Sequence, residues 1–96
     1  MKTNDVAIIG AGPAGIACTI QLSRYGIMPL LFERDIPGGL LKNANLVENY
    51  PGFPGGIKGT KLIEKMTRQL DMAQVTVIHE NVTLVSCKED LFRIKT

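Results

Sequence analysis

Short apolar runs alternate with stretches of mixed polarity in the first third of the chain. Val6–Ile9 is a continuous apolar run that ends at a glycine, and it predicts a strand buried on both faces, as in a parallel sheet. Pro13–Tyr25 predicts a helix, because proline suits the first helical turn and Gly26 suits the stop. Met28–Phe32 is a second short apolar run. The order strand, helix, strand predicts a βαβ unit with parallel strands.

The middle of the chain breaks this pattern. Residues 34–59 contain six of the ten glycines and three of the five prolines. A structureless loop of this length is uncommon, and apolar residues such as Leu41, Val47 and Ile57 recur within it. We therefore expect an ordered loop that is wrapped on another surface.

Helix and strand patterns return in the last third. Thr60 is expected to cap a helix that extends to about Met72, with Leu62, Met66 and Leu70 at helical spacing. Short apolar segments predict a third strand and a hairpin, at 75–78, 82–87 and 91–95, with the hairpin turn at 88–90. The expected fold class is α/β: a Rossmann-like unit with parallel strands plus a small β-hairpin or meander.

Composition and charge narrow the range of functions. The 96 residues suffice for one small domain, and 11 Lys and Arg against 9 Asp and Glu give too little charge to indicate a nucleic-acid or acidic membrane partner. No apolar run approaches the roughly 20 residues that span a bilayer, so we expect a cytoplasmic protein. Cys18 and Cys87 lie far apart and outside any C-x-x-C pair, so we expect reduced thiols and no metal site.

The clearest chemical signal is a G-x-G-x-x-G motif between the first predicted strand and the first predicted helix. It consists of Gly10, Ala11, Gly12, Pro13, Ala14 and Gly15. In this setting the first glycine allows a tight turn, the second lets backbone approach a pyrophosphate, and the third lets the helix pack closely on the strand. The helix N-terminus offers free N–H groups and partial positive charge to the phosphates. The motif therefore predicts a dinucleotide site.

Two further features follow the motif. Glu33 ends the second predicted strand, where a carboxylate accepts hydrogen bonds from ribose hydroxyls and repels a 2′-phosphate. Gly38 and Gly39 follow closely, and a second glycine pair lets another backbone segment approach the dinucleotide. An NAD-binding domain normally continues directly into its next helix, so this pair favours FAD. An NAD-dependent dehydrogenase domain is the alternative.

Together these residues resemble the N-terminal part of the thioredoxin reductase family, which are FAD- and pyridine-nucleotide-dependent disulfide oxidoreductases. The resemblance covers Val6–Glu33, the Gly38-Gly39 pair and the stretch VENYPGFP at 47–54, which generic dinucleotide-binding domains lack. It implies that a complete enzyme would pass hydride from NAD(P)H to FAD and electrons on to a disulfide or another acceptor.

The resemblance also implies a role in FAD binding for each matching position. The Gly10 to Gly15 segment would hold the pyrophosphate, and Glu33 would hold the adenosine ribose. The remaining implied contacts are Arg34 and the backbone near Val82 beside the adenine, Gly38, Gly39, Leu40 and Leu41 along the pyrophosphate and ribityl chain, and Asn49 beside the isoalloxazine ring. The family usually has glutamine at the position of Leu40, so this chain departs from the family pattern there.

The family's NAD(P)H domain and its redox C-x-x-C have no counterpart in this sequence. We therefore expect residues 1–96 to form a partial FAD-binding domain, the N-terminal segment of such a reductase, that is inactive alone. Uncovered apolar faces and strand edges would favour association. The expected partners are FAD and either a second copy in a homodimer or a complementing chain. The alternative function is a non-catalytic nucleotide-binding or assembly fragment.

Overall fold

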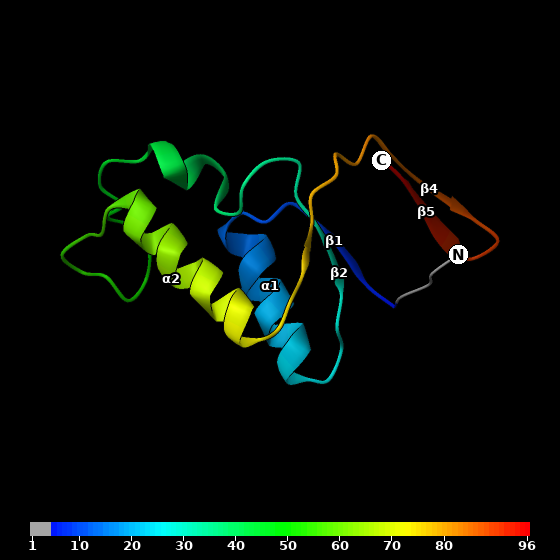
Figure 1. Ribbon diagram of the computed structural model, residues 1–96, viewed down its shortest axis with the longest axis horizontal. Coiled ribbons are helices and arrows are strands. Elements are labelled where there is room, and N and C mark those ends of the chain that lie inside the picture. Colours follow the sequence, from blue (N-terminus) through cyan, green and yellow to red (C-terminus); the bar gives the residue numbers. More distant parts are fainter. Residues whose placement is uncertain (1–4) are drawn as a thin grey trace.

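The protein combines a small helix-covered sheet with a projecting hairpin (Figure 1). The computed structural model describes residues 5–96. The elements are β1 (Ala7–Ile9), α1 (Pro13–Arg24), β2 (Leu30–Phe32), the 3₁₀ helix η1 (Gly39–Asn43), α2 (Gly59–Met72), β3 (Val77–Ile78), β4 (Leu84–Lys88) and β5 (Leu91–Lys95). The predicted α/β class is confirmed, and most predicted boundaries differ from these by a residue or two.

The three-stranded sheet is parallel, in the order β1-β2-β3. Ile8 of β1 stands beside Leu31 of β2, which stands beside Val77 of β3. Helix α1 connects the first pair of strands, and the long middle segment with α2 connects the second. The βαβ unit predicted from the apolar runs is therefore confirmed.

Both helices lie on the same face of this sheet, and this corrects one prediction. Ile8 and Leu31 belong to the apolar cluster that the helices cover, whereas Ile9, which points to the opposite face, is 54% exposed. The expectation that the first strand is buried on both faces is therefore wrong for residues 5–96. The reason is that both connections between parallel strands pass over one face, and in the part of the chain that the structure describes no helix covers the other.

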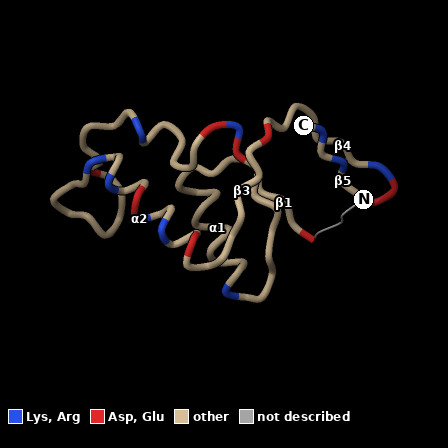
Figure 2. The backbone as a smooth tube through the Cα atoms, in the orientation of Figure 1, with Lys and Arg blue, Asp and Glu red and all other residues tan. Residues whose placement is uncertain are grey.

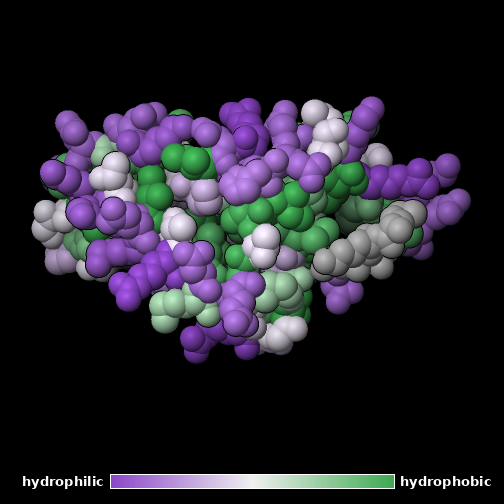
Figure 3. Space-filling view, viewed as in Figure 1, coloured by the Kyte–Doolittle hydropathy of each residue, from purple (hydrophilic) through white to green (hydrophobic). Residues whose placement is uncertain are grey.

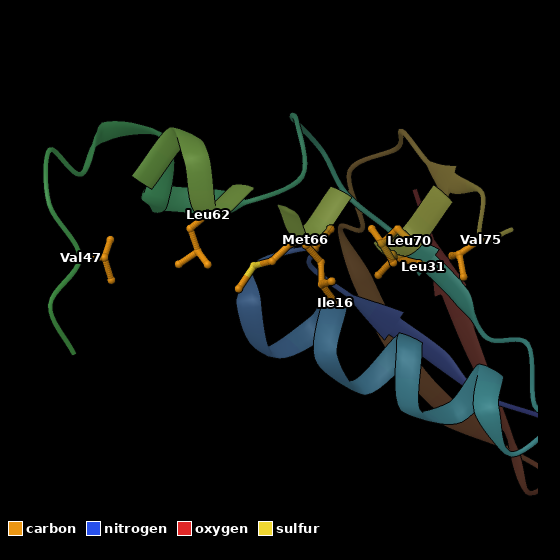
Figure 4. Close-up of a cluster of buried hydrophobic side chains, with 8 residues drawn as sticks. Ile16, Leu31, Val47, Leu62, Met66, Leu70 and Val75 are labelled. Atoms are coloured by element: carbon orange, nitrogen blue, oxygen red, sulfur yellow. The ribbon is translucent and has the colours of Figure 1, made fainter. Parts of the chain in front are cut away.

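The core forms where α2 crosses α1 and the sheet. Leu62, Met66 and Leu70 repeat at helical spacing along α2, and all three are buried. Figure 4 shows Met66 and Leu70 beside Ile16 of α1 and Leu31 of β2, with Leu62 further along α2 on the side of Val47. The predicted apolar stripe of this helix is thus confirmed, and it fixes how the second helix sits on the βαβ unit.

The glycine- and proline-rich middle segment is ordered, as predicted. It contains η1, and Val47 and Ile57 exchange two backbone hydrogen bonds, at N···O distances of 2.7 and 2.9 Å. This bridge closes the loop that carries the VENYPGFP sequence. Within the loop the rings of Tyr50 and Phe53 lie 6.4 Å apart between centroids. Val47 is buried, so the loop is attached to the core at its base.

Helix α2 begins two residues earlier than expected, and Thr60 is not its cap. The N-cap residue is Lys58, and no side chain caps the helix. Gly59 is buried, its N–H donates to the carbonyl of Ala44, and a Cβ there would lie 1.9 Å from the carbonyl oxygen of Leu41. Close packing against η1 therefore sets the start of the helix, where side-chain capping had been expected.

The hairpin projects away from the helices (Figure 1). Its strand β4 begins at Leu84, later than predicted, and its turn consists of Glu89 and Asp90, both with positive φ. Leu91 and Phe92 are exposed, as is most of the hairpin. The radius of gyration is 14.6 Å, against about 12.5 Å for a compact chain of this length, because the hairpin extends the long axis.

Apolar surface also gathers in the middle of one face of the molecule, between the helices and the hairpin (Figure 3). Among residues 5–96, no helix is both long enough and apolar enough to cross a membrane. Both cysteines are exposed and unpaired as thiols, Cys18 on α1 and Cys87 on β4.

Replacing Gly15 should destabilise the fold strongly. In Gly15→Ala the new Cβ would lie 1.9 Å from the Gly10 carbonyl oxygen, so helix α1 would have to move off β1. We expect a loss of about 3 kcal/mol or more in the free energy of unfolding, measured by urea denaturation followed by circular dichroism. The control is Gly55→Ala, whose Cβ meets nothing within 4 Å. Equal denaturation midpoints for the two variants would contradict this packing.

Candidate flavin site

The candidate site begins at the glycine turn between β1 and α1. Gly10 has a φ of +101°, which favours glycine, and its N–H donates to the carbonyl of Phe32 at 2.8 Å. Gly12 is the N-cap residue of α1, and neither a capping side chain nor an acidic residue stands in the first turn of this helix. A Cβ at Gly12 would meet no atom within 4 Å. The helix N-terminus is therefore open toward solvent at the position where the motif predicts a phosphate.

Ala11 joins this turn to two other segments. Its side chain is buried, its N–H donates to Oε1 of Glu33 at 2.9 Å, and its carbonyl accepts the N–H of Gly38 at 2.7 Å. Both polar atoms of the Ala11 backbone are thus engaged within the protein. Ala11 therefore links three segments: the first glycine segment, the end of β2 and the second glycine segment.

The Glu33 carboxylate lies at the end of β2 and is held by backbone. Oε1 accepts the Ala11 N–H, and Oε2 accepts the N–H of Asp35 at 2.9 Å. An ionised carboxylate offers about four lone-pair positions, so two hydrogen bonds leave it capacity for hydroxyl groups of a ligand. The exposed Arg34 and Asp35 follow it directly, so acidic and basic residues alternate at this end of the sheet (Figure 2).

The second glycine segment packs against the first. Gly38 has a φ of +112° and a Cβ there would lie 2.4 Å from the side chain of Ile63. The Cβ position of Gly39 lies 3.7 Å from Cα of Gly12, so the two backbone segments are neighbours. The next residue, Leu40, is 86% exposed, and Leu41 is packed against the core.

An ion pair lies across this second segment. Nζ of Lys42, in η1, is 2.5 Å from Oδ2 of Asp35. Hydrogen bonding to the Lys42 ammonium, together with its charge, holds the pKa of Asp35 below its ordinary value. On the other side, Nδ1 of His79 lies 3.2 Å from the Asp35 backbone oxygen. Sequence reasoning missed both residues of the pair, because a seven-residue separation in a loop gives no periodic signal.

The structure brings together most, but not all, of the predicted site residues. Direct contacts join the Gly10–Gly15 turn, Glu33, Gly38 and Gly39. Asn49 is exposed in the loop closed by the Val47 bridge, and Val82 lies partly buried just before β4. Within residues 5–96, no hydrogen bond links either residue to the glycine turn. Their predicted contacts to a flavin ring and to adenine stay predictions.

The sequence is similar to curated proteins over its whole length. Residues 4–95 match the pattern of the pyridine nucleotide-disulphide oxidoreductase family. NADPH-dependent thioredoxin reductase 3 of Arabidopsis thaliana is 38% identical over 96 residues, which cover 96% of this chain and 18% of that protein. Thioredoxin reductase 1 of Saccharomyces cerevisiae is 35% identical over 101 residues, which cover 100% of this chain and 32% of that protein.

The fold is also similar to those of solved structures. Thioredoxin reductase of Lactococcus lactis has a TM-score of 0.88 and 36% identity, over 97% of this chain and 30% of that one. A ferredoxin-flavin thioredoxin reductase from Clostridium acetobutylicum has a TM-score of 0.89 and 30% identity, over 99% of this chain and 33% of that one.

The chain thus spans about a third, or less, of the length of these relatives. The family pattern covers nearly all of it, and the glycine turn, the acidic strand end and the second glycine segment all lie within the matched residues. The chain therefore belongs to the pyridine nucleotide-disulphide oxidoreductase family.

Proposed function

We propose that this chain is the N-terminal FAD-binding segment of a thioredoxin reductase-like flavoprotein oxidoreductase. The observation that carries the proposal is the meeting of two glycine segments at the open N-terminus of α1. Gly39 lies against Gly12 there, and Ala11 ties both segments to Glu33. Such an arrangement offers backbone N–H groups to a pyrophosphate and a carboxylate to a ribose.

The residues present fit such a dinucleotide. The absence of a side chain at Gly12 leaves space beside the helix N-terminus, and no acidic residue in the first turn of α1 opposes an anion. The unused hydrogen-bonding capacity of Glu33 suits the vicinal hydroxyls of a ribose, and its charge disfavours a 2′-phosphate at this position. The site thus combines an anion-binding turn with an acceptor for an unphosphorylated adenosine ribose.

In the proposed complex each candidate residue has a distinct place. The Gly10–Gly15 turn holds the pyrophosphate. Ala11 contributes indirectly, because its backbone fixes the positions of Glu33 and Gly38. The other proposed contacts are Glu33 at the ribose, Arg34 and the backbone near Val82 at the adenine, Gly38, Gly39, Leu40 and Leu41 along the pyrophosphate and ribityl chain, and Asn49 at the flavin ring. Bound FAD would supply the electron-carrying chemistry, and these residues bind and orient it.

The activity of a whole enzyme is part of the same proposal. Electrons would pass from NAD(P)H through the flavin to a disulfide or another acceptor. Residues 1–96 hold no C-x-x-C pair, so reactive cysteines for a disulfide substrate would come from outside them. We assign residues 1–96 to part of the FAD-binding domain and place NAD(P)H binding outside them. The relatives' greater length supports this assignment.

Association with a second copy or a complementing chain also stays a prediction. The uncovered sheet face at Ile9 and the exposed apolar residues of the hairpin, Leu84, Val85, Leu91 and Phe92, support it. Sedimentation velocity on the purified chain tests it. A monomer across the micromolar range, with no complementing chain bound, would contradict it.

The first test is direct cofactor binding by the chain. We expect titration with FAD to quench flavin fluorescence in a saturable way, and FAD to bind more tightly than NAD⁺, because the second glycine segment gives the flavin half of the ligand a second backbone surface. Isothermal calorimetry gives both affinities. If the flavin fluorescence stayed that of free FAD throughout the titration, the chain would not bind FAD by itself. Tighter binding of NAD⁺ would favour the dehydrogenase alternative.

A second test separates the site from the fold. Gly12→Ala adds a Cβ that meets no protein atom within 4 Å, at an ordinary φ of −75°. We expect its unfolding free energy to change by less than about 0.5 kcal/mol. Its FAD affinity should fall about tenfold or more, equivalent to ~1.4 kcal/mol, because the methyl group occupies the pyrophosphate position.

The matched control for this variant is Gly55→Ala, which also adds a methyl group into open space. It should change neither stability nor FAD affinity. If Gly12→Ala bound FAD as tightly as this control, the pyrophosphate would not lie at the glycine turn.

A further inference from the structure

The contacts around the second glycine segment form a closed ring. The Glu33 carboxylate accepts the N–H groups of Ala11 and Asp35, at 2.9 Å each. The Asp35 carboxylate pairs with Lys42 of η1, and Gly38, at the start of η1, donates its N–H to Ala11. The ring therefore runs from the glycine turn through the end of β2 and across to η1, and returns to the turn.

Helix η1 needs such contacts with other segments because its own hydrogen bonds stabilise it little. It has five residues, no capping side chain and a first backbone hydrogen bond, from Leu41 to Gly38, of 3.3 Å. Short 3₁₀ helices have poor hydrogen-bond geometry. Its far end is tied to α2 through the bond from Gly59 to Ala44. At its near end, the Gly38 N–H bond ties it to the glycine turn, and the pair of Asp35 and Lys42 ties it to the segment that follows β2.

We propose that Asp35 and Lys42 form an electrostatic clamp that holds Gly38 and Gly39 against the glycine turn, and that both are positioning residues for the dinucleotide. The ligand part of this inference rests on the proposed function, whereas the clamp concerns the chain alone. The Asp35 backbone is itself fixed, by its N–H bond to Glu33 and by the contact of its carbonyl oxygen with His79 after β3. The Asp35 carboxylate therefore extends from a fixed backbone position toward Lys42.

The exposure of the pair sets the size and the signature of the effect. The side chains of Lys42 and Asp35 are 38% and 59% exposed, so the clamp is modest and is screened by salt. Its loss should open the Gly38 segment about two- to fivefold more often. If the opening rate rises with salt, and this salt dependence is lost when either charge is removed, the contact is an electrostatic clamp and not ordinary packing.

The test without ligand is amide hydrogen exchange of Gly38, followed by NMR on the whole chain at low salt. In Lys42→Met and in Asp35→Asn we expect exchange to be about two- to fivefold faster, and in the double variant no faster than in either single one. Molar sodium chloride should raise the wild-type rate to that of the variants and leave the variants unchanged.

The matched control is Lys61→Met, which removes the same charge from the exposed pair with Glu64 on α2. It should leave the Gly38 rate unchanged. The clamp is overturned if the two single variants exchange at the wild-type rate, or if the control accelerates exchange as much as they do.

FAD titration of the same variants tests the positioning role. Asp35→Asn and Lys42→Met should weaken FAD binding by the same factor, about two- to fivefold. Weakening by Lys42→Met alone would overturn the clamp in favour of a direct contact between the ammonium group and the ligand. A wild-type chain that binds no FAD would refute the proposed function, and the exchange rates would still decide whether the clamp exists.

Discussion

The geometry of the site depends on the two hydrogen bonds made by the backbone of Ala11. A buried N–H or carbonyl group without a partner costs on the order of 1–3 kcal/mol, so this buried unit needs both Glu33 and Gly38 in place. One peptide segment thereby fixes the acidic end of β2 and the start of η1 relative to the glycine turn. The glycine turn and the start of the long loop, which α1 and β2 separate in sequence, are thereby held together.

Its contact with Ala11 gives Glu33 two roles. Its carboxylate holds protein backbone through both oxygens, and in the proposed function it also receives ribose hydroxyls. The first role prepares the second, because a side chain already held in one orientation loses little rotamer freedom when a ligand arrives. The acid is therefore preorganised by the fold.

Local patterns in the sequence predicted the elements and the glycine turn, because they depend on neighbouring residues. The apolar run before Gly10, the proline at the start of α1 and the stripe of Leu62, Met66 and Leu70 all lie where the structure has them. Contacts between distant segments were not predictable in this way. The burial of Gly59 against η1 displaced the expected Thr60 cap, and the pair of Asp35 and Lys42 has no sequence signature. The open sheet face at Ile9 likewise depends on where both helices pass.

The two pairs of parallel strands differ in the length of chain that connects their partners. Leu31 and Val77 are twice as far apart in sequence as Ala7 and Leu30, since the second connection carries the whole glycine-rich segment. Loop-closure entropy rises only with the logarithm of loop length, so this doubling costs about 0.6 kcal/mol. The long segment therefore adds little to the entropy that the chain loses when β3 pairs with β2, although it accounts for about a quarter of the residues.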